Sequence, residues 1–120
     1  MKKLVLIILT LGMITTQSFA QKIENTIVCF KSNMDCENCQ TTLTEYLKFE
    51  KGVKDLKVDL VSNTVMIKYK GEKNNDEEFA KAIEKKGYEA IKISMDDYKK
   101  IVAETNPKLS DEIEKKLINN

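Results

Sequence analysis

The chain has 120 residues, 20 of them basic and 19 acidic, and it contains three cysteines but no histidine. Its near-neutral charge lacks the basic excess of a nucleic-acid binder, so we expect no nucleic acid among its partners. The lack of histidine excludes a zinc site of the Cys/His type and catalysis by a histidine base. The length suits one small domain.

Residues 1–20 have the three-part layout of a secretory signal peptide. Two lysines begin the segment, an apolar run follows at 4–14, and small residues end it at 18–20. The run is too short for a membrane span, which needs about 20 apolar residues. We therefore predict cleavage after Ala20, a periplasmic or secreted protein, and no membrane span after cleavage. An uncleaved N-terminal anchor is the alternative.

The remaining chain predicts strands and helices in the order β-α-β-β-α-β. Strand segments are rich in β-branched and aromatic residues or alternate in polarity, whereas helix segments have apolar residues at three- and four-residue spacings. The expected strands are residues 23–32, 53–60, 65–69 and 88–93, and the expected helices are residues 37–51 and 76–87. Gly52 follows the first helix, where a left-handed residue is preferred, and Ser62 and Asn63 form the turn between the central strands.

This order predicts an α+β fold, the ferredoxin-like βαββαβ sandwich, in which two helices cover one face of a four-stranded antiparallel sheet. We expect this domain at residues 21–93 and a C-terminal helical extension at 94–120. Within the extension, Ser94 caps one helix, Pro107 breaks it and Ser110 caps another. These amphipathic helices cover either the domain's own core or open sheet face, or else a partner or second copy.

Cys36 and Cys39 form a C-x-x-C pair where the first strand passes into the first helix. This spacing lets both sulfurs converge, and thiolates are soft ligands for Cu(I), zinc and related ions. Two thiolates satisfy an ion of near-linear coordination such as Cu(I) or Hg(II), while a closed structural zinc site needs four protein ligands. A helix N-terminus also favours the thiolate form. We predict one thiophilic ion at this pair, with Cu(I) expected and Zn(II), Cd(II) and Hg(II) as alternatives.

The same cysteine spacing serves redox proteins. Thioredoxin-like enzymes usually place an aromatic residue, Gly or Pro beside or between their cysteines, whereas Glu37 and Asn38 stand between them here. A thiol-disulfide redox protein, an inert structural disulfide, and an interaction module that acts through residues 94–120 remain as alternatives. The sequence has no activated nucleophile, phosphate loop or carboxylate constellation, so we expect no enzyme.

The third cysteine, Cys29, lies within the first expected strand. Neighbouring strand residues point to opposite faces, so burial of Phe30 in the core would place Cys29 on the far face, away from the pair. We expect a packing or surface role for it. We interpret Asp35, Glu37 and the lysines 85–86 as solvated charges or partner-recognition groups, because a soft ion prefers sulfur.

Residues 24–93 resemble the heavy-metal-associated domain of copper chaperones, metal-transporting ATPases and a periplasmic mercury-binding protein. Four segments carry the resemblance in order and at the family's spacing. They are the metal-loop sequence Met-Asp-Cys-Glu-Asn-Cys at 34–39, Gly-Val at 52–53, the hairpin at 58–65, and the second-helix exit at 82–90. The resemblance is therefore more specific than the cysteine pair alone.

The resemblance implies that Cys36 and Cys39 are the metal ligands and that Met34 turns into the core beneath the loop. It also implies that Tyr88 faces the cysteines and shields the ion, although the residues alone equally allow a core aromatic. The implied partner is a cysteine-bearing metal transporter or acceptor protein, whose thiols attack the ion through a three-coordinate intermediate. A scavenger of mercury or another heavy metal is a variant of this function.

Overall fold

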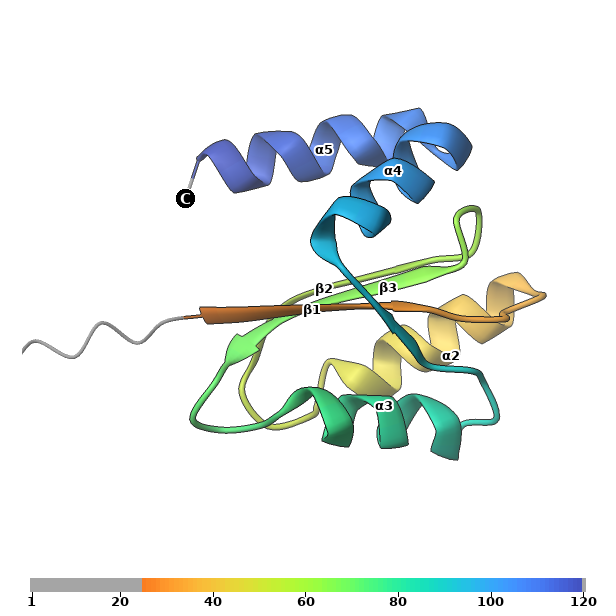
Figure 1. The fold of residues 1–120 in the computed structure, drawn as a ribbon. Helices are drawn as coiled ribbons and strands as arrows, with labels where there is room; N and C mark the ends of the chain where they lie inside the picture. Colours follow the sequence, from red (N-terminus) through yellow and green to blue (C-terminus); the bar gives the residue numbers. More distant parts are fainter. Residues whose placement is uncertain (1–24, 120) are drawn as a thin grey trace, which may run out of the picture.

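The expected order of strands and helices is present in the computed structural model, which describes residues 25–119. The predicted signal peptide at 1–20 lies outside the described residues. The strands are β1 (Asn25–Lys31), β2 (Val53–Asp59), β3 (Thr64–Lys70) and β4 (Ile91–Ile93), and the helices are α2 (Glu37–Leu47), α3 (Asp76–Lys85), α4 (Met95–Thr105) and α5 (Pro107–Ile118). Helices α2 and α3 lie on one face of the sheet and α4 and α5 on the other (Figure 1). The ferredoxin-like fold with additional C-terminal helices is confirmed.

The sheet has the order β2-β3-β1-β4, and its neighbouring strands are antiparallel. In β1, Val28 and Phe30 face α2 and α3, whereas Cys29 between them faces α4 and α5. This alternation is the two-residue period of a strand, and it explains why β1 has an almost continuous apolar sequence. Helices α2 and α3 cover one face of β1, and α4 and α5 cover the other. The main core contains Val28, Phe30, Met34, Leu43, Leu47, Val58, Val65, Ile67, Tyr69, Phe79, Ala82 and Ile83.

Strand β2 contains a bulge that reconciles its apolar spacing with one buried face. Val53 and Leu56 are three residues apart, which would place them on opposite faces of a regular strand. The register with β3 shifts between Val53 and Asp55, so one extra residue is accommodated there. Both apolar side chains consequently pack against the main core.

The C-terminal helices cover the second face of the sheet with a core of their own. Four buried side chains from α4 and α5 pack against Cys29 and Met66 of the sheet; these are Tyr98, Val102, Leu109 and Ile113. The extension was expected to cover either the domain itself or a partner; in the structure it covers the domain's own sheet. None of the helices within residues 25–119 has the length and apolar character to cross a membrane.

Two element ends differ most from expectation. Helix α2 ends at Leu47 and not at residue 51, because Leu47 is its last buried residue and Phe49 beyond it is 80% exposed. Strand β4 begins at Ile91 and not at residue 88, because the preceding loop is hydrogen-bonded to a side chain outside the sheet. Gly52 has the expected positive φ, 78°, although it follows a turn after the helix.

Helix α5 begins at Pro107, so the predicted cap at Ser110 is wrong. Asn106 is the N-cap, and its side chain accepts a hydrogen bond from the Leu109 backbone N–H at 3.4 Å. Proline is favoured at the first helical position, since it has no N–H to leave unpaired. The Ser94 cap on α4 is confirmed, since its hydroxyl accepts from the Asp97 N–H at 3.1 Å.

The buried Cys29 thiol in the core beneath α4 and α5 (the second core) predicts that the stability of the protein depends on pH. Burial raises the pKa of the Cys29 thiol from 9.0 to about 12. The unfolded chain therefore ionises first, and the contribution of Cys29 to stability is complete below about pH 9 and is lost as the pH rises toward 12. We expect the free energy of unfolding to fall by up to about 1.4 kcal/mol per pH unit more with Cys29 than with Cys29→Ala.

Urea unfolding at about pH 8 and about pH 10 measures this difference. Both proteins should carry Cys36→Ser and Cys39→Ser, so that no other thiol titrates. Burial also raises the pKa of Tyr69 and Tyr98, but both tyrosines are common to the two proteins. Equal pH slopes would contradict the assignment.

Candidate metal centre

The cysteine pair forms the first turn of α2. Cys36 is the N-cap residue in an extended conformation, and its Sγ accepts a hydrogen bond from the Cys39 backbone N–H at 3.0 Å. Its carbonyl oxygen accepts from the N–H groups of Cys39 and Gln40 at 3.1 and 3.3 Å. The helix N-terminus and the N–H donor both favour a negative charge on this sulfur. The local sequence thus places the Cys36 sulfur where the helix would stabilise a thiolate in the reduced protein.

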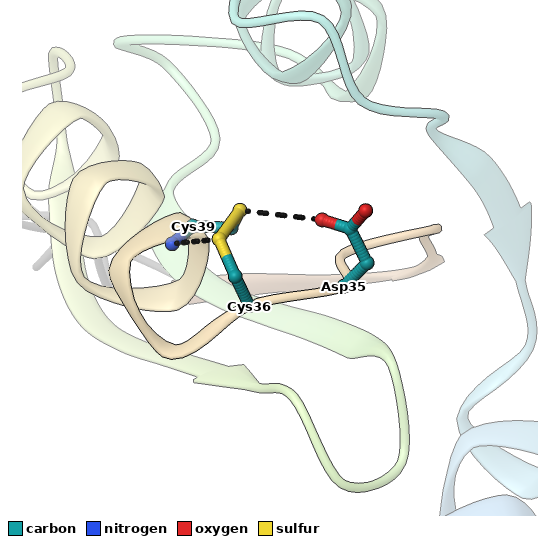
Figure 2. Close-up of side chains that lie close together, drawn as sticks. All are labelled: Asp35, Cys36 and Cys39. Atoms are coloured by element: carbon teal, nitrogen blue, oxygen red, sulfur yellow. Dashed lines mark hydrogen bonds between the residues drawn. A yellow bond between two sulfur atoms is a disulfide. The ribbon is translucent and has the colours of Figure 1, made fainter.

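Cys36 and Cys39 are joined by a disulfide, with their Cα atoms 5.1 Å apart (Figure 2). The predicted convergence of the two sulfurs is therefore present. The disulfide is the oxidised form of the pair. Two electrons and two protons convert it to two thiols, which lose those protons when they bind a metal as thiolates.

Asp35 adds a carboxylate to the cysteine pair. Its Oδ1 atom lies 3.5 Å from Cys39 Sγ (Figure 2). The candidate ligand atoms of Asp35, Cys36 and Cys39 all lie within 4.8 Å of one another. A carboxylate attracts a cation, and in the reduced protein it can accept a hydrogen bond from the Cys39 thiol. The group therefore offers two sulfur donors and one oxygen donor.

The sequence pattern predicts Asp35 only as a solvated or partner-recognition charge. Its side chain is indeed exposed, but it points toward the sulfurs. The available signal was its position directly before Cys36 in the loop; because Asp35 precedes the N-cap, helical spacing does not predict its contact with Cys39. Glu37 lies in the first turn of the same helix but does not join this group.

Asn63 holds the cysteine loop from the β2–β3 turn. Its side-chain Oδ1 accepts from the Met34 N–H at 2.7 Å, and its Nδ2 donates to the Met34 carbonyl at 2.9 Å. Its own carbonyl accepts from the Ser32 N–H at 2.8 Å. Asn63 has a φ of 56°, a left-handed conformation that asparagine tolerates better than most residues. The sequence predicts Asn63 in the turn but carries no local sign of these contacts.

The two further residues singled out by the resemblance lie against the main core. Met34 is only 3% exposed, so it packs beneath the loop as expected. Tyr88 is half-buried against the same core, in the position of a core aromatic. The loop that carries it is tied to the cysteine loop by the Glu89 N–H, which donates to Asn33 Oδ1 at 2.8 Å. Shielding of the ion by Tyr88 stays a prediction.

The other candidate residues lie apart from the pair. Cys29 is a free, buried thiol on the opposite face of the sheet. Lys86 lies over the ring of Tyr46, with its Nζ 4.3 Å from the ring centroid, and Lys85 is exposed. Among the described residues, Asp35, Cys36 and Cys39 form the one group of three candidate ligands.

Comparison with known proteins places this site within a described family. The family model "Heavy-metal-associated domain" matches residues 28–89. A copper form of a CopA variant from Bacillus subtilis is 27% identical, with a TM-score of 0.50, over 57% of this chain and 92% of that chain. Oxidized MerP from Ralstonia metallidurans CH34 is 18% identical, with a TM-score of 0.56, over 59% and 100%. The putative copper-ion-binding protein from Bacillus anthracis str. Ames is 22% identical, with a TM-score of 0.53, over 57% and 97%. None of the curated proteins matches the chain.

The contacts of Asn63 predict that its side chain stabilises the cysteine loop. Asn63→Gly keeps the positive φ but removes both amide hydrogen bonds, so we expect the free energy of unfolding to fall by about 1 to 3 kcal/mol. Hydrogen exchange at the Met34 amide should also accelerate. Asn63→Asp keeps the acceptor for the Met34 N–H but sets a carboxylate oxygen against the Met34 carbonyl in place of a donor, so it should be destabilised as well. A glycine variant as stable as the wild type would contradict this role.

Proposed function

Because the chain belongs to the heavy-metal-associated domain family, we propose that it binds one thiophilic metal ion between Cys36 and Cys39 and delivers it by thiolate exchange. The observation that carries this proposal is the position of both sulfurs at the N-terminus of α2, beside an exposed carboxylate. Two thiolates leave part of the ion's coordination shell unfilled. An acceptor's cysteines can then attack the ion before the first pair releases it. The protein acts as a carrier, not as an enzyme.

Cu(I) is the ion we propose first. A soft monovalent ion is satisfied by two thiolates, and the helix N-terminus stabilises the negative charge that these thiolates bring. Two of the similar structures have copper in their descriptions. Hg(II) shares this coordination preference, so scavenging of mercury is a variant of the same chemistry.

Zn(II) or Cd(II) is the second candidate, and Asp35 is the observation that favours it. Zinc accepts carboxylate oxygen together with thiolate sulfur and prefers four ligands, so a third protein donor helps it more than it helps Cu(I). Asp35 Oδ1 lies close enough to both sulfurs to complete a three-donor set. The charge and hardness of this oxygen therefore bear on the choice of ion.

We propose that the protein works outside the cytoplasm, in the periplasm or as a secreted protein. The signal-like segment at 1–20 supports this location. The expected acceptor is a cysteine-bearing transporter or acceptor protein. In an oxidising compartment the pair must be reduced before it can load, because a disulfide offers no thiolate.

Thiol-disulfide exchange is the second candidate function, and the disulfide between Cys36 and Cys39 favours it. In that reaction the disulfide accepts two electrons from a substrate dithiol, which becomes oxidised. Such a protein would have a reduction potential in the range of disulfide catalysts and would bind metal weakly. The two functions are therefore separated by metal affinity.

Anaerobic titration of the reduced protein with Cu(I) against a competing chelator tests the carrier function. We expect tight one-to-one binding, and we expect Cys36→Ser/Cys39→Ser to weaken it by more than about 100-fold, since loss of outer-shell groups alone costs roughly 10- to 100-fold. Cys29→Ala is the matched control, because it removes a thiol on the other face of the sheet. Absence of competitive binding by the wild type would overturn the carrier function and favour the redox one.

Titration of Asp35→Asn with Zn(II) and Cu(I) tests the oxygen donor. We expect the zinc affinity to fall by about 10- to 100-fold and the Cu(I) affinity to change little. Glu37→Gln removes the same charge from the same turn without touching the ligand group, so it is the control. Equal losses of zinc affinity in the two variants would show a general charge effect and would exclude Asp35 as a ligand.

A further inference from the structure

The end of the domain opposite the cysteines is basic. Four lysines, together with Gly52, Val53 and Glu72, line an open hollow of about 570 Å³. These are Lys51, Lys54, Lys70 and Lys73. None of the four forms an ion pair with a residue of the described range 25–119. Glu72 is the one acidic residue of the lining, so the hollow has an uncompensated positive charge.

The hollow gathers four lysines, unpaired within residues 25–119, around one carboxylate, whereas part of the positive charge elsewhere is neutralised. Lys48, Lys81, Lys92 and Lys116 each pair with a carboxylate. The whole chain has a formal charge of only +1. The lysines of the hollow therefore form a local excess of positive charge at this end, and the acidic residue Asp35 lies at the other end, beside the cysteines.

Strand pairing connects the N-terminal segment to the basic end. Asn25, the first described residue, pairs with Lys70. The chain therefore enters the described domain beside the hollow. Helix α2 begins at the other end of β1 (Figure 1), so the length of the strand, about 20 Å, separates the hollow from the cysteine loop.

Exposed apolar side chains border the basic end. Phe49 is 80% exposed and lies two residues before Lys51. Ile118, at the end of α5, is 81% exposed, and the ion pair between Lys116 and Asp55 places this end of the helix beside the start of β2. Large apolar groups among lysines are typical of a surface that rests on the lipid headgroup region, where lysine chains extend their charges toward phosphates.

We propose that this end of the domain docks on an anionic phospholipid surface. The lysines contact the lipid phosphates, Phe49 enters the headgroup region, and the cysteine loop points away from the membrane toward an acceptor. An acidic lipid surface fits better than an acidic protein because the exposed Phe49 lies next to the lysines, and a lipid headgroup region accepts both their charge and an aromatic ring. Each lysine near such a surface contributes about a fivefold gain in binding.

Vesicle sedimentation tests the proposal. Residues 25–119 contain both cores, so the chain from residue 21 keeps the whole fold and lacks the apolar run that would itself bind lipid. We expect this protein to bind phosphatidylcholine vesicles that contain phosphatidylglycerol and not pure phosphatidylcholine vesicles. We expect replacement of the four hollow lysines with Gln to weaken binding by about 100-fold or more. Added salt should also weaken it.

The matched control replaces four exposed lysines outside the hollow with Gln. These are Lys85, Lys99, Lys100 and Lys108. The control has the same net charge as the first variant, so it should still bind, and circular dichroism should show both variants folded. Equal loss of binding in the two variants would overturn the proposal.

Two further outcomes bear on the proposal. Alkylation of the reduced Cys36 and Cys39 should proceed at the same rate with and without vesicles, because the loop faces away from the lipid. Protection of these cysteines by vesicles would overturn the proposed orientation. Binding to poly-glutamate but not to phosphatidylglycerol vesicles would overturn the lipid assignment in favour of an acidic protein partner.

Discussion

The hydrogen bonds between the β2–β3 turn and the cysteine loop fix the shape of the metal centre. The loop runs from the end of β1 to the first turn of α2, where no strand partner is available to its backbone. Asn63 supplies partners instead, to the N–H and the carbonyl of Met34 and to the N–H of Ser32. Buried backbone groups need such partners. The turn therefore positions Met34 in the core and, through the next two residues of the chain, Asp35 and Cys36.

The same turn is held from the second face of the sheet. Asp59 is buried, and its carboxylate accepts from the N–H and hydroxyl of Ser62 and from Asn106 Nδ2 between α4 and α5. A buried carboxylate that lost these donors would be costly. The C-terminal helices thus do more than cover apolar surface, because Asn106 also holds Asp59, which binds Ser62 next to Asn63. Hydrogen bonds thus link Asn106 to the turn through Asp59 and Ser62, and Asn63 links the turn to the cysteine loop.

The sequence predicted the features that depend on local patterns and not those that depend on distant side chains. Alternation in residues 65–69 and helical spacing after residue 37 were enough for the order of the elements and for the cysteines at a helix N-terminus. The contact of Asn63 with Met34 spans 29 residues and has no local signature. Both Asn106 and Ser110 are suitable N-cap residues for α5. The helix starts after Asn106 because Pro107, the next residue, is favoured at the first helical position. The end of α2 depended on burial, since its sequence pattern continued past the last core contact.

The sheet also separates the three cysteines in a way that limits their chemistry. Cys29 lies in the second core, and burial raises the pKa of its thiol to about 12, so it supplies almost no thiolate near neutral pH. Thiolate is the form that attacks a disulfide or binds a metal. Cys36 and Cys39 consequently have each other as their available thiol partner within the described residues. The disulfide in this structure has no thiolate for a metal, whereas the dithiol formed by its reduction could load. For the carrier that we propose, metal binding then depends on reduction of the disulfide by an external reductant, and not on reaction of the pair with Cys29.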